Sequence, residues 1–205
     1  MIESKKDYLH YLEEDRIALR RRKHNLYGRI KDFILPNCAW RFQKILLATE
    51  YHLNCKHKLR YLFYYYRLLS LGDKIGVYIP PNCFGPGLNI IHLHGIFVWD
   101  RAKIGKNCRI CHEVTIGSTP STHLAPKLGD NILIGAGAKI LGDIEIADNI
   151  AIGANSVVVD SFIEPGITIA GIPAKKVSAK GSEDYIRELA SWRRIIMCEY
   201  GCNNR

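Results

Sequence analysis

The stretch LGDNILIGAGAKILGDIEIADNIAIGANSVV, residues 128–158, carries a branched aliphatic residue at every sixth position. The same step begins upstream at residue 98 and is interrupted once, between residues 116 and 128, where it doubles to twelve. A helix does not repeat every six residues, and simple strand alternation would not select one position in six. The positions that share the step are Val98, Ile104, Ile110, Ile116, Leu128, Ile134, Ile140, Ile146, Ile152 and Val158.

This period is typical of hexapeptide repeats, in which three hexads form one coil of a parallel β-helix and each aliphatic side chain points into the core. Each coil covers its neighbour, so the apolar core is continuous although no single coil could bury its own face. The segment GSTPSTHLAPK, residues 117–127, replaces one hexad with two prolines and polar residues while the register is kept. We therefore expect a loop extruded from a coil, a position where functional residues are common.

The sequence before the repeats has a helical pattern. Apolar residues recur at steps of three and four up to about residue 75, with a break at Pro36 and glycines at the end. This front segment holds sixteen Lys and Arg against eight Asp and Glu, a net charge of 16 − 8 = +8 out of +9 for the whole chain. The cluster RRRK at 20–23 follows Glu13, Glu14 and Asp15, and we interpret it as a solvated helix face.

The composition excludes several classes of protein. No aromatic-studded nucleic-acid module accompanies the basic segment, so we expect no nucleic-acid partner. No signal peptide or apolar run long enough to cross a bilayer is evident, so we expect a cytoplasmic chain without a transmembrane segment. Seven irregularly spaced cysteines do not form a disulfide framework. Cys108 and Cys111 form a C-x-x-C without a second pair, and we interpret them as two small wall residues rather than a zinc site.

Residues 76–178 resemble the left-handed β-helix acyltransferases, and within them the serine acetyltransferases. The matching segments are GLNIIHLHGIFV, VTIG, APKLGDNILIGAGAKILGDIEI, IGANSVV and AGIPAKKV. The resemblance implies a helical N-terminal region followed by a left-handed parallel β-helix with one extruded loop and a C-terminal helix. The expected divisions are a basic α-helical domain at 1–75, a β-helix acetyltransferase domain at 76–178, and a C-terminal helix and tail at 179–205.

The resemblance also implies transfer of an acetyl group from acetyl-CoA to a hydroxyl, with His92 as the general base. An alcohol is a weak nucleophile at neutral pH, so a positioned imidazole must take its proton. The alternative for His92, which lies two hexad steps before Ile104, is a neutral core histidine at a coil corner. For the acetyl-CoA, the resemblance implies a lining of Gly117, Ala136 and Ala154 for the pantetheine arm, and Lys175 and Lys176 for the phosphates.

The acceptor half departs from the family pattern. Ile91 and Val77 stand where the family has aspartates that hold the serine substrate and orient the imidazole, and LAPK stands in place of RHPK. The residues expected to meet the acceptor are Asn89, His123 and Lys127, with Ser118, Thr119 and Thr122 as further neutral groups. Because a zwitterion needs counter-charges that these replacements remove, the sequence slightly favours a saccharide hydroxyl over L-serine.

Two other classes of protein stay open. His94 lies eighteen residues, one coil, before His112, so these two rings are expected to stack. That spacing permits a metal-dependent enzyme of the carbonic-anhydrase type, although no third ligand is evident and we expect no metal. A non-catalytic trimeric scaffold is the other alternative. The resemblance implies a homotrimer or a dimer of trimers, and the terminal Arg205 predicts no docking to cysteine synthase, which in the family grips a C-terminal isoleucine.

Overall fold

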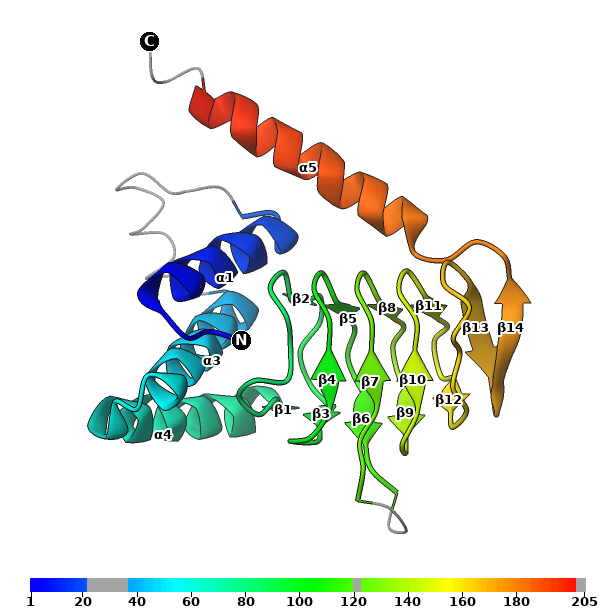
Figure 1. Cartoon of the computed structure of the whole chain (residues 1–205), viewed down its shortest axis with the longest axis horizontal. Coiled ribbons are helices and arrows are strands. Elements are labelled where there is room, and N and C mark those ends of the chain that lie inside the picture. The colour runs from blue at the N-terminus through cyan, green and yellow to red at the C-terminus, as the bar shows by residue number, and fades with distance from the viewer. Residues whose placement is uncertain (22–36, 120–122, 202–205) are drawn as a thin grey trace.

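The computed structural model of the chain describes residues 1–21, 37–119 and 123–201. Within them, the helices α1 (Lys5–Ala18), α3 (Cys38–Asn54) and α4 (Lys58–Ile75) precede the strands, and α5 (Glu183–Gly201) follows them (Figure 1). The helical front segment and the C-terminal helix predicted from the sequence are therefore confirmed. The tail that carries Arg205, the second half of the basic cluster and Thr122 lie outside the described residues.

The helix ends follow local rules. The Ser4 side chain accepts a hydrogen bond from Asp7 N at 3.2 Å and begins α1, and Asn37 does the same for Trp40 N at 2.8 Å at the start of α3. Gly76, with φ of 62°, ends α4 in the left-handed conformation. The sequence did not predict the break between α3 and α4, since no glycine or proline marks residues 55–57.

Among the described residues the strands form three sheets. The five-stranded sheet contains β1 (Val77–Tyr78), β3 (Ile96–Val98), β6 (Thr115–Gly117), β9 (Lys139–Leu141) and β12 (Val157–Val158). The three-stranded sheet contains β4 (Lys103–Ile104), β7 (Lys127–Leu128) and β10 (Glu145–Ile146). The six-stranded sheet contains β2 (Asn89–Ile90), β5 (Arg109–Ile110), β8 (Leu133–Ile134), β11 (Ala151–Ile152), β13 (Thr168–Gly171) and β14 (Ala174–Ser178).

From β2 to β12 the chain visits the six-stranded, five-stranded and three-stranded sheets in rotation, so successive strands belong to different sheets. Strands one turn apart pair in parallel, for example Lys139 with Val157, a step of eighteen residues. The turn that includes the extruded loop pairs Thr115 with Lys139, a step of twenty-four. The loop therefore adds six residues to a complete turn, and does not replace a hexad as the sequence predicted. All ten positions of the hexad pattern are buried, which confirms the core prediction.

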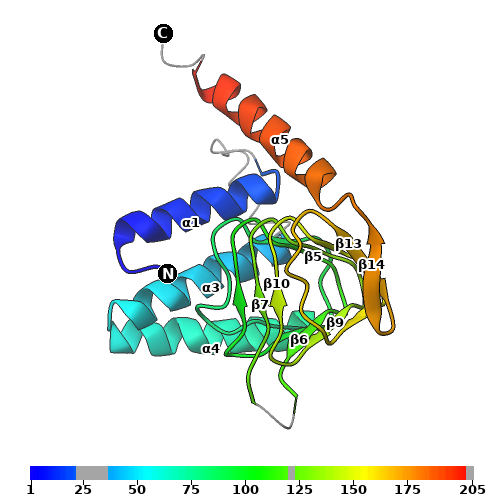
Figure 2. The same ribbon diagram turned by 45° about the vertical axis from the view of Figure 1, so that its right-hand side comes forward.

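The C-terminal helix does more than close the last turn. Figures 1 and 2 show α5 running back above the strands toward α1. Tyr185 and Leu189 pack against Ile17 and Ala18 of α1, and Arg193 Nη1 contacts Glu14 Oε1 at 3.0 Å. Arg20 forms an ion pair with Glu188 of α5. Arg20 is exposed, as predicted for the basic cluster, but it lies in the turn after α1 and not on a helix.

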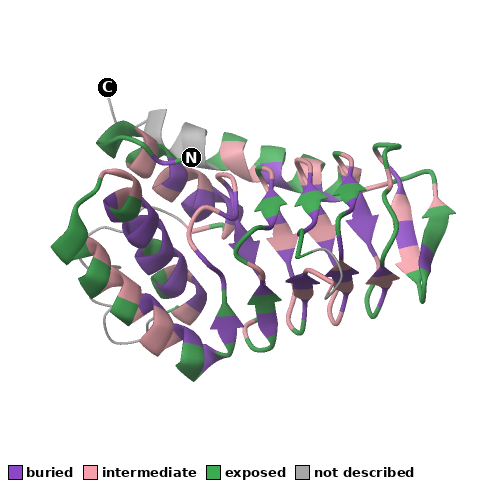
Figure 3. Cartoon of the chain, turned by 60° about the horizontal axis from the view of Figure 1, so that its bottom comes forward, coloured by how far each residue is buried: buried purple, intermediate pink, exposed green. Residues whose placement is uncertain are grey.

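A buried carboxylate joins the helices to the strands. Asp15 is 1% exposed and accepts hydrogen bonds from Gly87 N at 2.8 Å, Leu88 N at 2.9 Å and Gln43 Nε2 at 2.9 Å. Burial raises the pKa of Asp15 to about 7, and these hydrogen bonds oppose that rise. The helices differ in how far they are buried. Ten residues of α3 are buried, whereas the buried residues of α4 are Leu68, Gly72 and Ile75. Figure 3 colours the whole chain by burial.

Candidate functional site at the histidine corner

His92 and His112 lie on adjacent turns at the edge between the six-stranded and five-stranded sheets. We call the turns of residues 91–95 and 111–114 the histidine corner. Ile90 pairs with Ile110, and Val98 pairs with Ile116. The first turn therefore takes eight residues from Ile90 to Val98, whereas the second takes six from Ile110 to Ile116. The two extra residues place His92 level with His112, since each histidine comes two residues after its paired isoleucine.

The two rings of the histidine corner are in contact. The centroids of His92 and His112 are 5.7 Å apart and the ring planes meet at 73°, an edge-to-face arrangement. His92 is exposed, so it is not the core histidine that the sequence left as an alternative. The expected stacking of His94 on His112 is wrong. The first turn is two residues longer than the second, so the residue level with His112 is His92, twenty positions earlier, and not His94, eighteen positions earlier. His94 is exposed and adopts φ of 76° in the tight turn.

Small residues continue the column of His92 and His112 along the molecule. Ile110 pairs with Ile134, and Ile134 with Ile152, so Ala136 and Ala154 occupy the position of His112 on the next two turns. Gly135 allows these turns to approach closely, because a Cβ added to it would lie 2.6 Å from Ala154 N. A narrow strip of small side chains therefore runs away from the two imidazoles.

The other residues predicted to line the acetyl-CoA are more scattered. Gly117 ends β6 and is buried, and a Cβ added there would meet Leu141 at an ordinary 3.5 Å. Lys175 and Lys176 are exposed on β14, which pairs antiparallel with β13 at the end of the six-stranded sheet. Lys176 Nζ is 2.6 Å from Glu164 Oε1, so this cation is already paired.

The acceptor residues are not brought together in one chain. His123 and Lys127 follow β6, where the chain passes from the five-stranded to the three-stranded sheet. His92 precedes β3, where the chain passes from the six-stranded to the five-stranded sheet. Lys127 Nζ forms an ion pair with Glu145 at 3.1 Å. The assignment of Asn89 to the acceptor is corrected: its side chain is buried and its amide donates to Ala18 O at 2.8 Å, so it anchors α1 instead.

The structure also locates the positions that differ from the family pattern. Val77 is buried in β1, and Ile91 follows β2 directly, so neither offers a carboxylate to His92. Glu113, the residue after His112, is exposed, and its amide donates to His94 O at 3.0 Å. A carboxylate of the same chain therefore belongs to the histidine corner. The sequence offered Glu113, with Asp73 and Asp100, only as a carboxylate from a neighbouring subunit.

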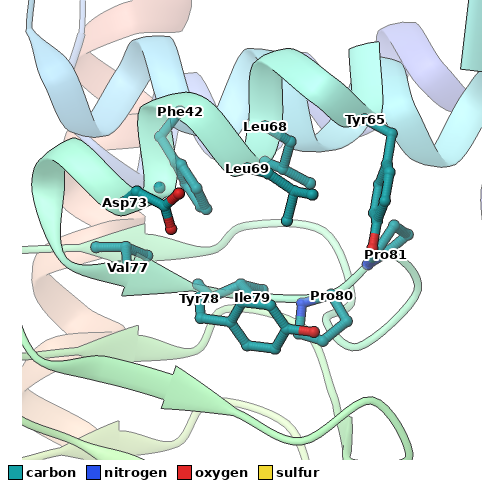
Figure 4. A pocket seen from close by; sticks show the side chains of 11 residues that line it. Phe42, Tyr65, Leu68, Leu69, Asp73, Val77, Tyr78, Ile79, Pro80 and Pro81 are labelled. Carbon is teal, nitrogen blue, oxygen red and sulfur yellow. The ribbon is translucent and has the colours of Figure 1, made fainter. Parts of the chain in front are cut away.

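A separate pocket lies between α4 and the segment 77–81 (Figure 4). The space in it that can hold the centre of a water-sized sphere is about 30 Å³, and Phe42, Leu68 and Leu69 give it apolar walls. Asp73 and the rings of Tyr65 and Tyr78 lie at this pocket as well. None of the predicted site residues lines it, so it is distinct from the histidine corner.

No group of three or more His, Cys, Asp or Glu side chains that could hold a metal ion occurs in residues 1–21, 37–119 and 123–201. In the same part of the chain no helix has the length and hydropathy needed to span a membrane.

Comparison with known proteins points to one family, although no family model matches the chain. The serine acetyltransferase of Helicobacter pylori strain J99 is 38% identical over 126 residues, which cover 60% of this chain and 73% of the relative. The serine acetyltransferase of Synechococcus elongatus is 38% identical over 120 residues, but only 49% of it is covered. The match to the serine acetyltransferase of Salmonella typhimurium covers only 38% of that relative. The chain therefore spans half or less of the length of several curated relatives.

Solved structures agree with the sequence comparison. The crystal structure of serine acetyltransferase from Brucella abortus strain S19 has a TM-score of 0.71 and 31% identity, and the match covers 88% of this chain and 73% of that one. The structure of the same enzyme in complex with coenzyme A has a TM-score of 0.70 and 32% identity, with 88% and 71% covered. By sequence and by structure, this chain belongs to the serine acetyltransferase family.

Proposed function

We propose that the protein is an acetyl-CoA-dependent O-acetyltransferase in which His92 is the general base. The observation that carries this proposal is the exposed His92 ring at the head of the strip formed by Ala136 and Ala154. The chain resembles a solved serine acetyltransferase that binds coenzyme A. We further propose that the coil of strands is left-handed, which the hexad period and this likeness support.

His92 would take the proton of an acceptor hydroxyl as its oxygen attacks the thioester carbonyl carbon. The new C–O bond forms a tetrahedral oxyanion, which backbone N–H groups of the turn are suited to stabilise. When the intermediate collapses, the C–S bond breaks and the coenzyme A thiolate leaves with the proton that the imidazolium held. Atoms and charges then balance, and His92 is neutral again for the next turnover.

The acetyl-CoA would lie along the small-residue strip. Ala136 and Ala154 leave room for a pantetheine arm beside the histidine corner, and Gly117 would line the same arm, as the resemblance implies. Lys175, exposed on β14, and Lys176, once released from Glu164, would supply cations for the phosphates. We propose that residues 76–178 form this catalytic domain, with residues 1–75 as a separate helical domain and 179–205 as a C-terminal helix and tail.

The acceptor is a hydroxyl compound, and we favour a saccharide. Ile91 and Val77 remove two carboxylates of the family pattern, and a neutral sugar hydroxyl does not need them. Tyr78 and Phe97 add a stacked pair of partly exposed rings, 5.2 Å apart, on the five-stranded sheet, and aromatic side chains are common in binding sites. L-serine is the second candidate, because the relatives carry that name and Glu113 could meet an ammonium group.

A complete site would require more than one chain. His92 and the loop residues His123 and Lys127 lie at opposite edges of the five-stranded sheet. A neighbouring copy could bring its loop to the histidine corner, so we propose a homotrimer, alone or paired as a dimer of trimers.

The deciding experiment follows release of free coenzyme A from acetyl-CoA with L-serine and with a panel of sugars and nucleotide sugars. We expect turnover with a sugar-containing acceptor. Turnover of L-serine at a rate that no sugar approaches would make L-serine the acceptor and show that the role of Ile91 was misread. Absence of both acetyl-CoA binding and coenzyme A release would favour a non-catalytic scaffold instead.

A further inference from the structure

His112 is a second imidazole in contact with His92, and the proposed reaction gives it no role. Its ring is half-buried, and its Nδ1 atom is fully covered without a hydrogen-bond partner among the described residues. A buried polar atom that makes no hydrogen bond costs about 1–3 kcal/mol, so such atoms are rare and usually have a functional or structural reason.

Backbone hydrogen bonds on both sides fix the segment that carries this ring. His112 O accepts a hydrogen bond from Gly137 N at 3.0 Å on the next turn, and the following amide, Glu113 N, donates to His94 O at 3.0 Å. The strand before it is paired on both sides, Ile110 with Ile90 and with Ile134. The unpartnered Nδ1 therefore belongs to a rigid part of the fold.

Another histidine pair in the same molecule shows that two imidazoles at a similar separation can be hydrogen-bonded. The rings of His52 and His57 have centroids 5.3 Å apart and planes at 58°, and their Nδ1 atoms are 3.0 Å apart, within hydrogen-bond distance. The His92 and His112 centroids are only 5.7 − 5.3 = 0.4 Å farther apart. Hydrogen bonds of catalytic groups are often long without substrate and shorten when the reacting complex forms.

We propose that His112 is a positioning residue for His92, and that its Nδ1 accepts a hydrogen bond from a ring N–H of His92 during catalysis. This rests on the proposed function, in which the other ring nitrogen of His92 takes the hydroxyl proton. His112 is then neutral with its own proton on Nε2, and it orients the His92 imidazolium until the proton passes to the thiolate. It takes the place of the imidazole-orienting carboxylate for which this chain has Val77.

The test compares His112→Phe, which keeps a ring but removes the nitrogen, with His112→Gln, which keeps a hydrogen-bond acceptor. The control is His94→Asn, because His94 is an exposed neighbour with positive φ and asparagine tolerates that conformation. Release of coenzyme A is measured with the acceptor that the wild type uses best. If it uses none of the panel, His92-dependent hydrolysis of acetyl-CoA is measured instead.

We expect His112→Phe to lower kcat about 10- to 100-fold, the loss that misplacing a reacting group by an ångström can cause. The KM for acetyl-CoA should stay unchanged and the thermal unfolding midpoint should not fall. His112→Gln should recover part of kcat, and His94→Asn should cost far less than His112→Phe. Full activity of His112→Phe, or equal losses in Phe and Gln variants, would overturn this role while leaving His92 as the base. If His92→Ala kept full activity, the proposed function itself would fail, and this inference with it.

Discussion

The chemistry proposed for this chain depends on single side chains at the histidine corner. His92 is exposed and contacts the His112 ring, but its side chain makes no hydrogen bond or ion pair with the described residues. Its removal should therefore affect the reaction much more than the folded structure.

We predict that His92→Ala lowers kcat about a hundred- to ten-thousand-fold, the usual contribution of a general base. Circular dichroism and acetyl-CoA binding by calorimetry should match the wild type, since Ala136 and Ala154 are untouched. His94→Ala should cost far less. A zinc analysis accompanies these assays: stoichiometric zinc, with activity lost on chelation, would support the metal-dependent class of enzyme and contradict the role given to His92.

Two glycines allow a matched prediction: Gly135 lies beside the strip, and Gly117 is predicted to line the pantetheine arm. A Cβ at Gly135 would lie 2.6 Å from Ala154 N, so Gly135→Ala must push two turns apart and should cost about 1–3 kcal/mol of unfolding free energy. At Gly117 the added Cβ would meet only Leu141, at 3.5 Å, and Thr115, at 3.9 Å. Gly117→Ala should keep the unfolding free energy but raise the KM for acetyl-CoA, if Gly117 lines the pantetheine arm. Unchanged kinetics in a stable Gly117→Ala protein would remove that residue from the site.

At the scale of elements, α1 is attached to α3 and to the first turn of strands through Asp15. Its pKa is about 7 in the folded protein against 3.8 for an ordinary Asp, because burial disfavours the charged form. The folded state therefore binds the proton more tightly than the unfolded state between these values. The stability that this group contributes is complete below pH 4 and is lost as pH rises toward 7.

We predict that the stability advantage of the wild type over Asp15→Asn shrinks as pH rises from about 4 to about 7. Urea unfolding at several pH values measures it. Glu50, buried and with its pKa also raised to about 7 by burial, should add a change of the same sign, so Glu50→Gln is the matched comparison. A constant difference between wild type and Asp15→Asn over this range would contradict the prediction.

At the scale of the whole molecule, the surface of α4 suggests how trimers could pair. Leu59, Leu62, Phe63 and Tyr66 recur at helical spacing and are all exposed. Exposed apolar stripes of this kind are common at contacts between chains. A second copy of this helix is the occupant we propose, in line with the expected dimer of trimers.

We predict that light scattering gives the mass of a trimer or of twice a trimer, and that Leu62→Glu with Phe63→Glu reduces the larger assembly to a trimer. Activity should persist in that trimer, because Leu62 and Phe63 are remote along α4 from Ile75, the residue of this helix that accepts a hydrogen bond from His94 N. An active monomer would refute the assembly, since His92 and the loop would then have to act from opposite edges of one sheet.

The sequence by itself determined the rotation of strands through three sheets, the ten buried hexad positions and the place of the loop. Each of these follows from a period of six, and every residue of a repeat is placed by its immediate neighbours. His92 was found from a motif of adjacent residues, and its exposure agrees with a role outside the core.

The tertiary structure decided what depends on contacts between distant segments. The pairing of Ile90 with Ile110 brings His92, and not His94, to His112. The packing of α1 turns Asn89 from an acceptor candidate into an anchor, and the return of α5 brings Glu188 to the exposed Arg20. A local pattern cannot encode these outcomes, because each depends on which of several possible partners the folded chain brings within reach.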